Sequence, residues 1–234
     1  MTAPSSFRAL LTPLQDAGLE VVVPRLYRRG WRALSGGFSP VDEAVRAREF
    51  VTSLRTTRTS VPIWLGGHSR GGQAAWRCAE LLATRDLGTA ALSPPADRGE
   101  PARAWDSGDL VSPAQDTPML AGLILVDPVD GAGRRPPGPD ACARPASFDL
   151  PTLIIGAGRG GSCAPTAVNH EVFAAAAPTA SHVVVTQLGH ADVLSGPALR
   201  VGRALCGGGP DPVAARLRVS ALMLAAIVDA QSGR

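Results

Sequence analysis

Residues 61–83 read VPIWLGGHSRGGQAAWRCAELLA and join three features in one run. The apolar residues 60–67 predict a buried strand. The turn Gly67-His68-Ser69-Arg70-Gly71 follows at once, and Gly71 to Ala83 has the apolar spacing of a helix. Such a turn alone is a common accident, but a strand before it and a helix after it are what a strained nucleophile turn requires. We therefore expect Ser69 to be a nucleophile.

The backbone of this turn has two further expected roles. Glycine at positions 67 and 71 lets neighbouring chain segments pass closely, because glycine carries no Cβ. The helix begins at the serine, so its positive end faces the reacting centre. The backbone N–H of Arg70 is then expected to donate to the oxyanion that forms during attack.

A serine hydroxyl is a weak nucleophile and needs a base within hydrogen-bond reach. His190 is the best candidate, because Gly189-His190 directly follows the last predicted strand, 182–186. The alternative is an ordinary surface histidine. His68 is expected to point away from the nucleophile, while His170 begins a predicted helix and His182 begins a strand.

The base needs a carboxylate to orient it. Asp127 closes the predicted strand 119–126 and is the expected acid. The next strand, 151–156, is followed by Gly156-Ala157-Gly158-Arg159-Gly160-Gly161-Ser162, which contains no carboxylate. Asp130 is the second choice, with a loop-capping role equally open to it, and Asp192 is too close to His190 in sequence.

Predicted strands and helices alternate along the chain. The strands are expected at 19–23, 60–67, 119–126, 151–156 and 182–186, and the helices at 6–17, 40–54, 71–83, 169–177 and 213–230. Such alternation predicts an α/β fold with a mostly parallel sheet covered by helices on both faces. Residues 1–234 are expected to form one domain, with 85–118 as a Pro/Gly-rich insertion or loop. Ser69, Asp127 and His190 each follow a strand, so we expect them at one edge of the sheet.

The composition excludes several function classes. The formal net charge is +3 and every basic residue is arginine, scattered along the chain, so no nucleic-acid-binding face is indicated. No apolar run approaches the ~20 residues of a membrane span, and the first residues do not read as a signal peptide. The four cysteines have no metal-ligand spacing. Cys142 and Cys163 could pair, but free thiols are favoured for a chain of this size.

Five blocks occur in a fixed order: Gly67-His68-Ser69-Arg70-Gly71-Gly72, Leu125–Gly131, Cys163-Ala164-Pro165, Asn169-His170-Glu171 and Gly189–Leu194. Together they resemble chlorophyllase, the plant and algal esterase that removes phytol from chlorophyll. The resemblance implies an α/β-hydrolase fold and a catalytic triad of Ser69, Asp127 and His190. It implies no metal and no organic cofactor, a chlorophyll or related chlorin ester as the small-molecule substrate, loose contact with membranes, and a chloroplast location.

The chain also departs from this family. The 85–118 insertion is longer than expected, and the opening strands are missing, so we expect an N-terminally truncated α/β-hydrolase fold. A His-Gly stretch that helps to build the family's oxyanion hole is missing with them. Loss of one oxyanion donor can lower a rate by ~10²–10³. A general esterase or lipase with another substrate, and a non-catalytic α/β-hydrolase-like protein, therefore stay open as alternatives.

Overall fold

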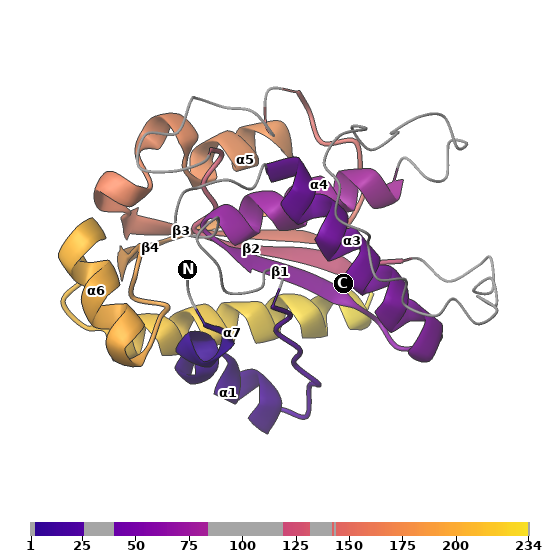
Figure 1. Cartoon of the computed structure of the whole chain (residues 1–234), viewed down its shortest axis with the longest axis horizontal. Helices are drawn as coiled ribbons and strands as arrows, with labels where there is room; N and C mark the ends of the chain where they lie inside the picture. Colours follow the sequence, from indigo (N-terminus) through magenta and orange to yellow (C-terminus); the bar gives the residue numbers. More distant parts are fainter. Residues whose placement is uncertain (1–2, 26–39, 84–118, 132–141, 143, 234) are drawn as a thin grey trace, which may run out of the picture.

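The computed structural model describes residues 3–25, 40–83, 119–131, 142 and 144–233 (Figure 1). Its centre is a four-stranded sheet with the order β1-β2-β3-β4. The strands are β1 (Trp64–His68), β2 (Gly122–Val126), β3 (Thr152–Arg159) and β4 (Ser181–Gly189). All neighbouring strands run parallel, which confirms the expected α/β class.

Helices cover both faces of this sheet (Figure 1). The helices are α1 (Arg8–Asp16), α3 (Pro40–Thr57), α4 (Arg70–Ala83), α5 (His170–Ala176), α6 (Gly196–Cys206) and α7 (Pro212–Gln231), with short 3-10 turns at Pro4–Phe7, Gly161–Cys163 and Thr166–Val168. One core lies between the sheet and α1 with α7, and a second lies between the sheet and α3, α4 and α5. Strand β2 is accordingly buried along its whole length, whereas several residues of the edge strand β4 are exposed.

The fully buried strand β2 explains why two cores form. Successive side chains of a strand point to opposite faces. Ile124 and Val126 accordingly join the core under α1 and α7, whereas Leu123 and Leu125 join the core under α4 and α5. Each such side chain contributes about 1.5–3 kcal/mol when it is fully buried. An uninterrupted apolar run is thus the pattern of a parallel strand covered on both sides.

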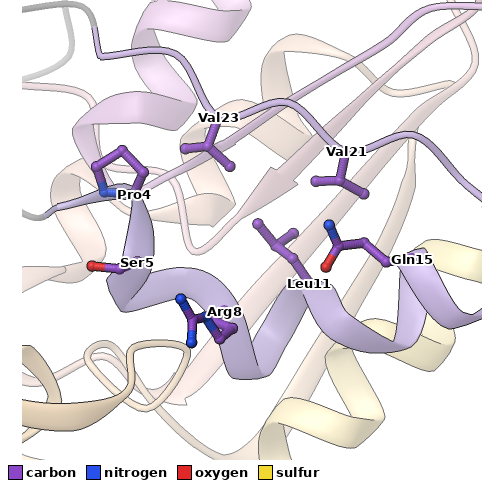
Figure 2. A pocket seen from close by; sticks show the side chains of 7 residues that line it. All are labelled: Pro4, Ser5, Arg8, Leu11, Gln15, Val21 and Val23. Carbon is purple, nitrogen blue, oxygen red and sulfur yellow. The ribbon is translucent and has the colours of Figure 1, made fainter.

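The prediction of a buried strand at 19–23 is wrong. This segment has no regular secondary structure and joins no strand, and Val22 and Val23 are 48% and 37% exposed. It lines an apolar cavity of about 450 Å³ together with β1 and Ile63, the residue before it. A smaller cavity of about 160 Å³ lies between Val21, Val23 and the start of α1 (Figure 2). A β-branched run becomes a strand only where a partner supplies hydrogen bonds and packing.

The other predicted elements are present, with boundaries that differ by a few residues. Helix α6 was not predicted, although Pro197 in its first turn and Gly207 after its end are ordinary helix signals. The expected insertion 85–118 lies outside the described residues. No helix in the described ranges is long and apolar enough to cross a membrane.

The cysteines correct a second expectation. Cys163 and Cys206 form a disulfide, which joins the turn after β3 to the end of α6. Cys78 and Cys142 are free thiols. The predicted candidate pair Cys142–Cys163 is therefore wrong, and so is the expectation that Cys163 and Cys206 are free.

Candidate active site

Ser69 occupies the bend between β1 and α4. Its φ angle is 56°, in the left-handed region that costs a residue with a Cβ about 1–3 kcal/mol. The bend is held by backbone hydrogen bonds: the Ser69 N–H donates to the Val126 carbonyl at 3.2 Å, and the Ser69 carbonyl accepts from Gly72 at 2.9 Å. The surrounding chain thus fixes the strained conformation that presents the hydroxyl.

The glycines around Ser69 differ from expectation. A Cβ on Gly67 would lie 2.6 Å from the Gly72 nitrogen and closer still to the Gly71 carbonyl, so glycine is required there. A Cβ on Gly71 would meet no atom within 4 Å, which contradicts the predicted close approach at that position. The close approach is instead at Gly72, where a Cβ would lie 2.7 Å from the Cβ of Pro128.

The three residues expected to act together do meet at the carboxyl ends of their strands. His190 Nε2 lies 2.9 Å from Ser69 Oγ, and His190 Nδ1 lies 2.6 Å from Asp127 Oδ2. His190 is 6% exposed and Asp127 is fully buried. An Nδ1–H that donates to Asp127 leaves the Nε2 lone pair free to accept the hydroxyl proton of Ser69.

Asp127 is itself fixed by the neighbouring strand. Its Oδ1 accepts the Ala157 N–H at 3.0 Å, and its own N–H donates to the Ile155 carbonyl at 2.6 Å. Its φ angle is 42°, which makes Asp127 and Ser69 the two residues other than glycine with positive φ among those described. Strained backbone of this kind is concentrated at functional sites.

The other carboxylates considered as acids have different partners. Asp130 Oδ1 accepts from Gln73 Nε2 at 2.7 Å, and its Oδ2 accepts from the Cys142 N–H at 3.0 Å, which is the loop-capping role left open for it. Asp192 accepts two backbone N–H groups and an arginine. Neither replaces Asp127 at His190.

A sequence model of the chlorophyllase family matches residues 111–231, just over half of the chain. The chain belongs to the chlorophyllase family. The matched stretch contains Asp127 and His190, and Ser69 lies before it. No curated protein and no solved structure matches the chain. Family membership and the shared α/β architecture agree with the expected resemblance.

His68 makes contacts with His190 in this candidate site that its sequence position did not reveal. Its ring lies 4.8 Å from the His190 ring, centroid to centroid, and its Nε2 lies 2.9 Å from the His190 carbonyl oxygen. A carbonyl only accepts, so His68 Nε2 carries a hydrogen and donates it. Burial, followed by repulsion from His190, lowers the pKa of His68 to about 3. His68 is therefore a neutral support for His190.

His170 and His182 form a second pair of neighbouring histidines. His170 Nδ1 lies 2.9 Å from His182 Nε2, and burial lowers the pKa of His170. The His170 ring packs on Gly156, where a Cβ would lie 2.5 Å from three ring atoms. Their partners are each other, so neither takes the place of His190 at Ser69.

Arg70 begins α4 directly after Ser69, and its side chain connects two helices. Its Nε donates to Glu43 Oε2 on α3 at 2.8 Å. The role of its backbone N–H as an oxyanion donor stays a prediction. Among the described residues no group of three or more His, Cys, Asp or Glu side chains could hold a metal ion.

The larger cavity also reaches the turn around Ser69. Gly67, His68 and Gly71 line it, and its remaining lining is mainly apolar, from α1, α3 and α7 among others. Ser69, Asp127 and His190 do not line it.

Proposed function

We propose that the chain is a serine carboxylic-ester hydrolase that cleaves chlorophyll, or a related chlorin ester, to chlorophyllide and phytol. The observation that carries the proposal is the hydrogen-bonded series from Ser69 Oγ to His190 to Asp127, with separations of 2.9 and 2.6 Å, in a chain of the chlorophyllase family. The series supplies a nucleophile, a base and an orienting acid. Family membership supports the chlorin ester as substrate.

The reaction follows from these contacts. Ser69 Oγ attacks the ester carbonyl while its proton passes to His190 Nε2. The resulting oxyanion accepts a hydrogen bond from the backbone N–H of Arg70. The positive end of the α4 dipole also stabilises its charge. Collapse breaks the bond to the alcohol oxygen, which takes the proton from His190, and an acyl-enzyme remains. Water then attacks the acyl carbon while its proton passes to His190. The bond to Ser69 Oγ breaks, Ser69 Oγ takes the proton back from His190, and the acid leaves.

The substrate's shape sets further expectations. Phytol is long and apolar, so its binding needs apolar surface and is aided by loose contact with a membrane. Membrane contact and a chloroplast location are parts of this proposal that rest on family resemblance. Neither a metal nor an organic cofactor takes part in the proposed steps.

The test is release of chlorophyllide by the purified chain. Chlorophyll a is supplied in detergent or aqueous acetone, a short p-nitrophenyl ester is tested beside it, and Ser69→Ala is the control. Chlorophyllide that appears with the wild type and not with Ser69→Ala supports the full proposal. Cleavage of the short ester alone retains the serine esterase and rejects the substrate. No turnover of either ester rejects catalysis by this chain.

A further inference from the structure

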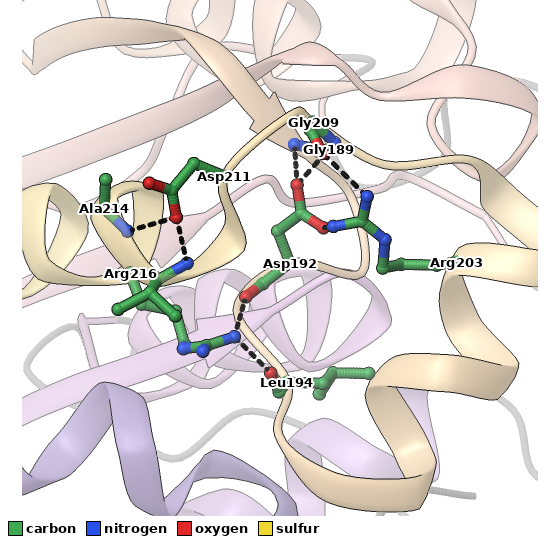
Figure 3. A network of polar contacts seen from close by, with 9 residues as sticks. Gly189, Asp192, Leu194, Arg203, Gly209, Asp211, Ala214 and Arg216 are labelled. Atoms are coloured by element: carbon green, nitrogen blue, oxygen red, sulfur yellow. Dashed lines mark hydrogen bonds and ion pairs between the residues drawn. The ribbon is translucent and has the colours of Figure 1, made fainter.

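Asp192 is a buried carboxylate that the proposed reaction does not use. It lies two residues after His190 and is fully buried. Its Oδ2 accepts the N–H of Gly189 at 2.8 Å and the N–H of Gly209 at 2.6 Å, and its Oδ1 accepts from Arg203 at 2.9 Å (Figure 3). A buried charge is stable only when it is paired and hydrogen-bonded in this way.

The glycine run Gly207-Gly208-Gly209 makes this arrangement sterically feasible. A Cβ on Gly208 would lie 2.7 Å from the Arg203 guanidinium carbon and 3.0 Å from Asp192 Oδ1. A Cβ on Gly209 would lie 2.9 Å from Asp192 Oδ2 and would also collide with the Gln187 carbonyl. Arg203, which also donates to Asp192, donates to the Gly209 carbonyl at 2.7 Å. The chain after α6 therefore wraps closely around one carboxylate.

A second arginine holds the same loop from α7. Arg216 Nη1 donates to the carbonyls of Asp192 and Leu194, each at 2.9 Å (Figure 3). Arg216 is buried. The backbone is thus fixed at Gly189 before His190 and at Asp192 and Leu194 after it. The backbone of His190 is therefore held from both sides.

We propose that Asp192, with Arg203 and Gly207–Gly209, positions His190 so that its Nδ1 meets Asp127 while its Nε2 meets Ser69. Asp192 is a positioning residue, because it acts through the backbone of Gly189 and touches none of the reacting groups. The inference rests on the proposed serine hydrolase. It extends that proposal to residues that do not react: Arg203 belongs to α6, and Gly207–Gly209 form the loop after it.

Asp192→Asn is the decisive change, because every partner of this side chain is a donor. An asparagine keeps only one acceptor oxygen, so its NH₂ group must face either Arg203 or the N–H groups of Gly189 and Gly209. Two donors then oppose each other, and the contacts that fix the chain around His190 are disturbed. A shift of about 1 Å at a reacting group costs up to ~10²-fold in rate. We therefore expect kcat on the short ester to fall about 10- to 100-fold, with KM changed by less than about 3-fold.

The rescue variant separates positioning from general damage. In Asp192→Asn/Arg203→Gln, the glutamine oxygen accepts from the new NH₂ group, and we expect much of kcat to return. Asp211→Ala is the matched control, because Asp211 only caps α7 by accepting from Val213 and Ala214. That control should lower the unfolding temperature and leave kcat within 2-fold. Arg203→Gln alone, at a partly exposed side chain, gives a milder loss in the same direction should Asp192→Asn fail to fold.

An activity-independent readout keeps the two proposals distinguishable. NMR of ¹⁵N-labelled histidine reports the tautomer and hydrogen bonding of His190. Altered His190 signals in Asp192→Asn, or in Arg203→Gln, support positioning even if the wild type cleaves no ester, in which case only the proposed function fails. Unchanged His190 signals, or a folded Asp192→Asn with kcat within 3-fold of wild type, overturn the inference.

Discussion

Alanine at two adjacent glycines should change stability in opposite directions. Gly71 and Gly72 both lie in the first turn of α4, and neither has a positive φ angle. Alanine is compatible with the backbone at both positions, and in a helix it is favoured over glycine by about 0.5–1 kcal/mol. Only the surroundings of the added methyl group therefore distinguish the two variants.

The surroundings set the magnitudes. The new Cβ of Gly72→Ala would lie 2.7 Å from Pro128 Cβ, which is about 0.8 Å short of a normal carbon–carbon contact. Overpacking of this kind costs about 1–3 kcal/mol, so after the helix gain the net loss is about 1 kcal/mol at mid-range and about 2.5 kcal/mol at most. The new methyl of Gly71→Ala meets no atom within 4 Å and leaves the gain of about 0.5–1 kcal/mol.

Urea unfolding followed by circular dichroism measures this difference. A gap of about 2 kcal/mol between the variants separates their midpoints by roughly 1 M in urea. Gly72→Ala should also lower kcat on the short ester, because Pro128 follows Asp127 and its displacement alters the Asp127–His190 contact. Equal shifts of the same sign would refute the reasoning. If Gly71→Ala is destabilising while Gly72→Ala is not, the added methyl group at position 71 must meet other atoms, and the reasoning from open space there is wrong.

Three further changes have expected outcomes. Asp127→Asn should lower kcat about 10³–10⁴-fold on the short ester with little change in KM, because it leaves His190 in the wrong tautomer. His68 is neutral when folded, with a pKa of about 3, and charged below about 6.5 when unfolded; stability in urea should therefore fall as pH drops from 6.5 toward 3, and less steeply in His68→Gln. Replacing Cys163 and Cys206 by serine should cost about 4 kcal/mol in unfolding free energy, because their disulfide closes a loop with a sequence separation of 43.

The sheet and the meeting of its three strand-end residues could be predicted because each signal is local. Ser69, Asp127 and His190 each follow an apolar run, and parallel topology brings the ends of such runs to one edge. The sequence favours Asp127 as the acid because the segment after β3 contains no carboxylate. The structure brings these residues within hydrogen-bond distance.

The features that depended on distant partners could not be predicted. Residues 19–23 have the composition of a strand, but composition does not supply the neighbour that a strand needs. The Cys163–Cys206 pairing joins the turn after β3 to the end of α6, and a sequence separation of 43 does not by itself bring the two segments together. The requirement for glycine at 72 comes from Pro128, which belongs to the loop of another strand.

Three buried aspartates show why the acid could be narrowed to a few candidates from the sequence but not assigned with its contacts. Asp127, Asp130 and Asp192 all follow a strand end, and all are fully buried. Asp192 has both oxygens occupied by N–H donors, and Asp130 caps a loop with both of its oxygens. Asp127 Oδ1 accepts the Ala157 N–H, which leaves Oδ2 to meet His190. The roles are thus assigned by the donors that surround each carboxylate, and those donors come from segments far away in the sequence.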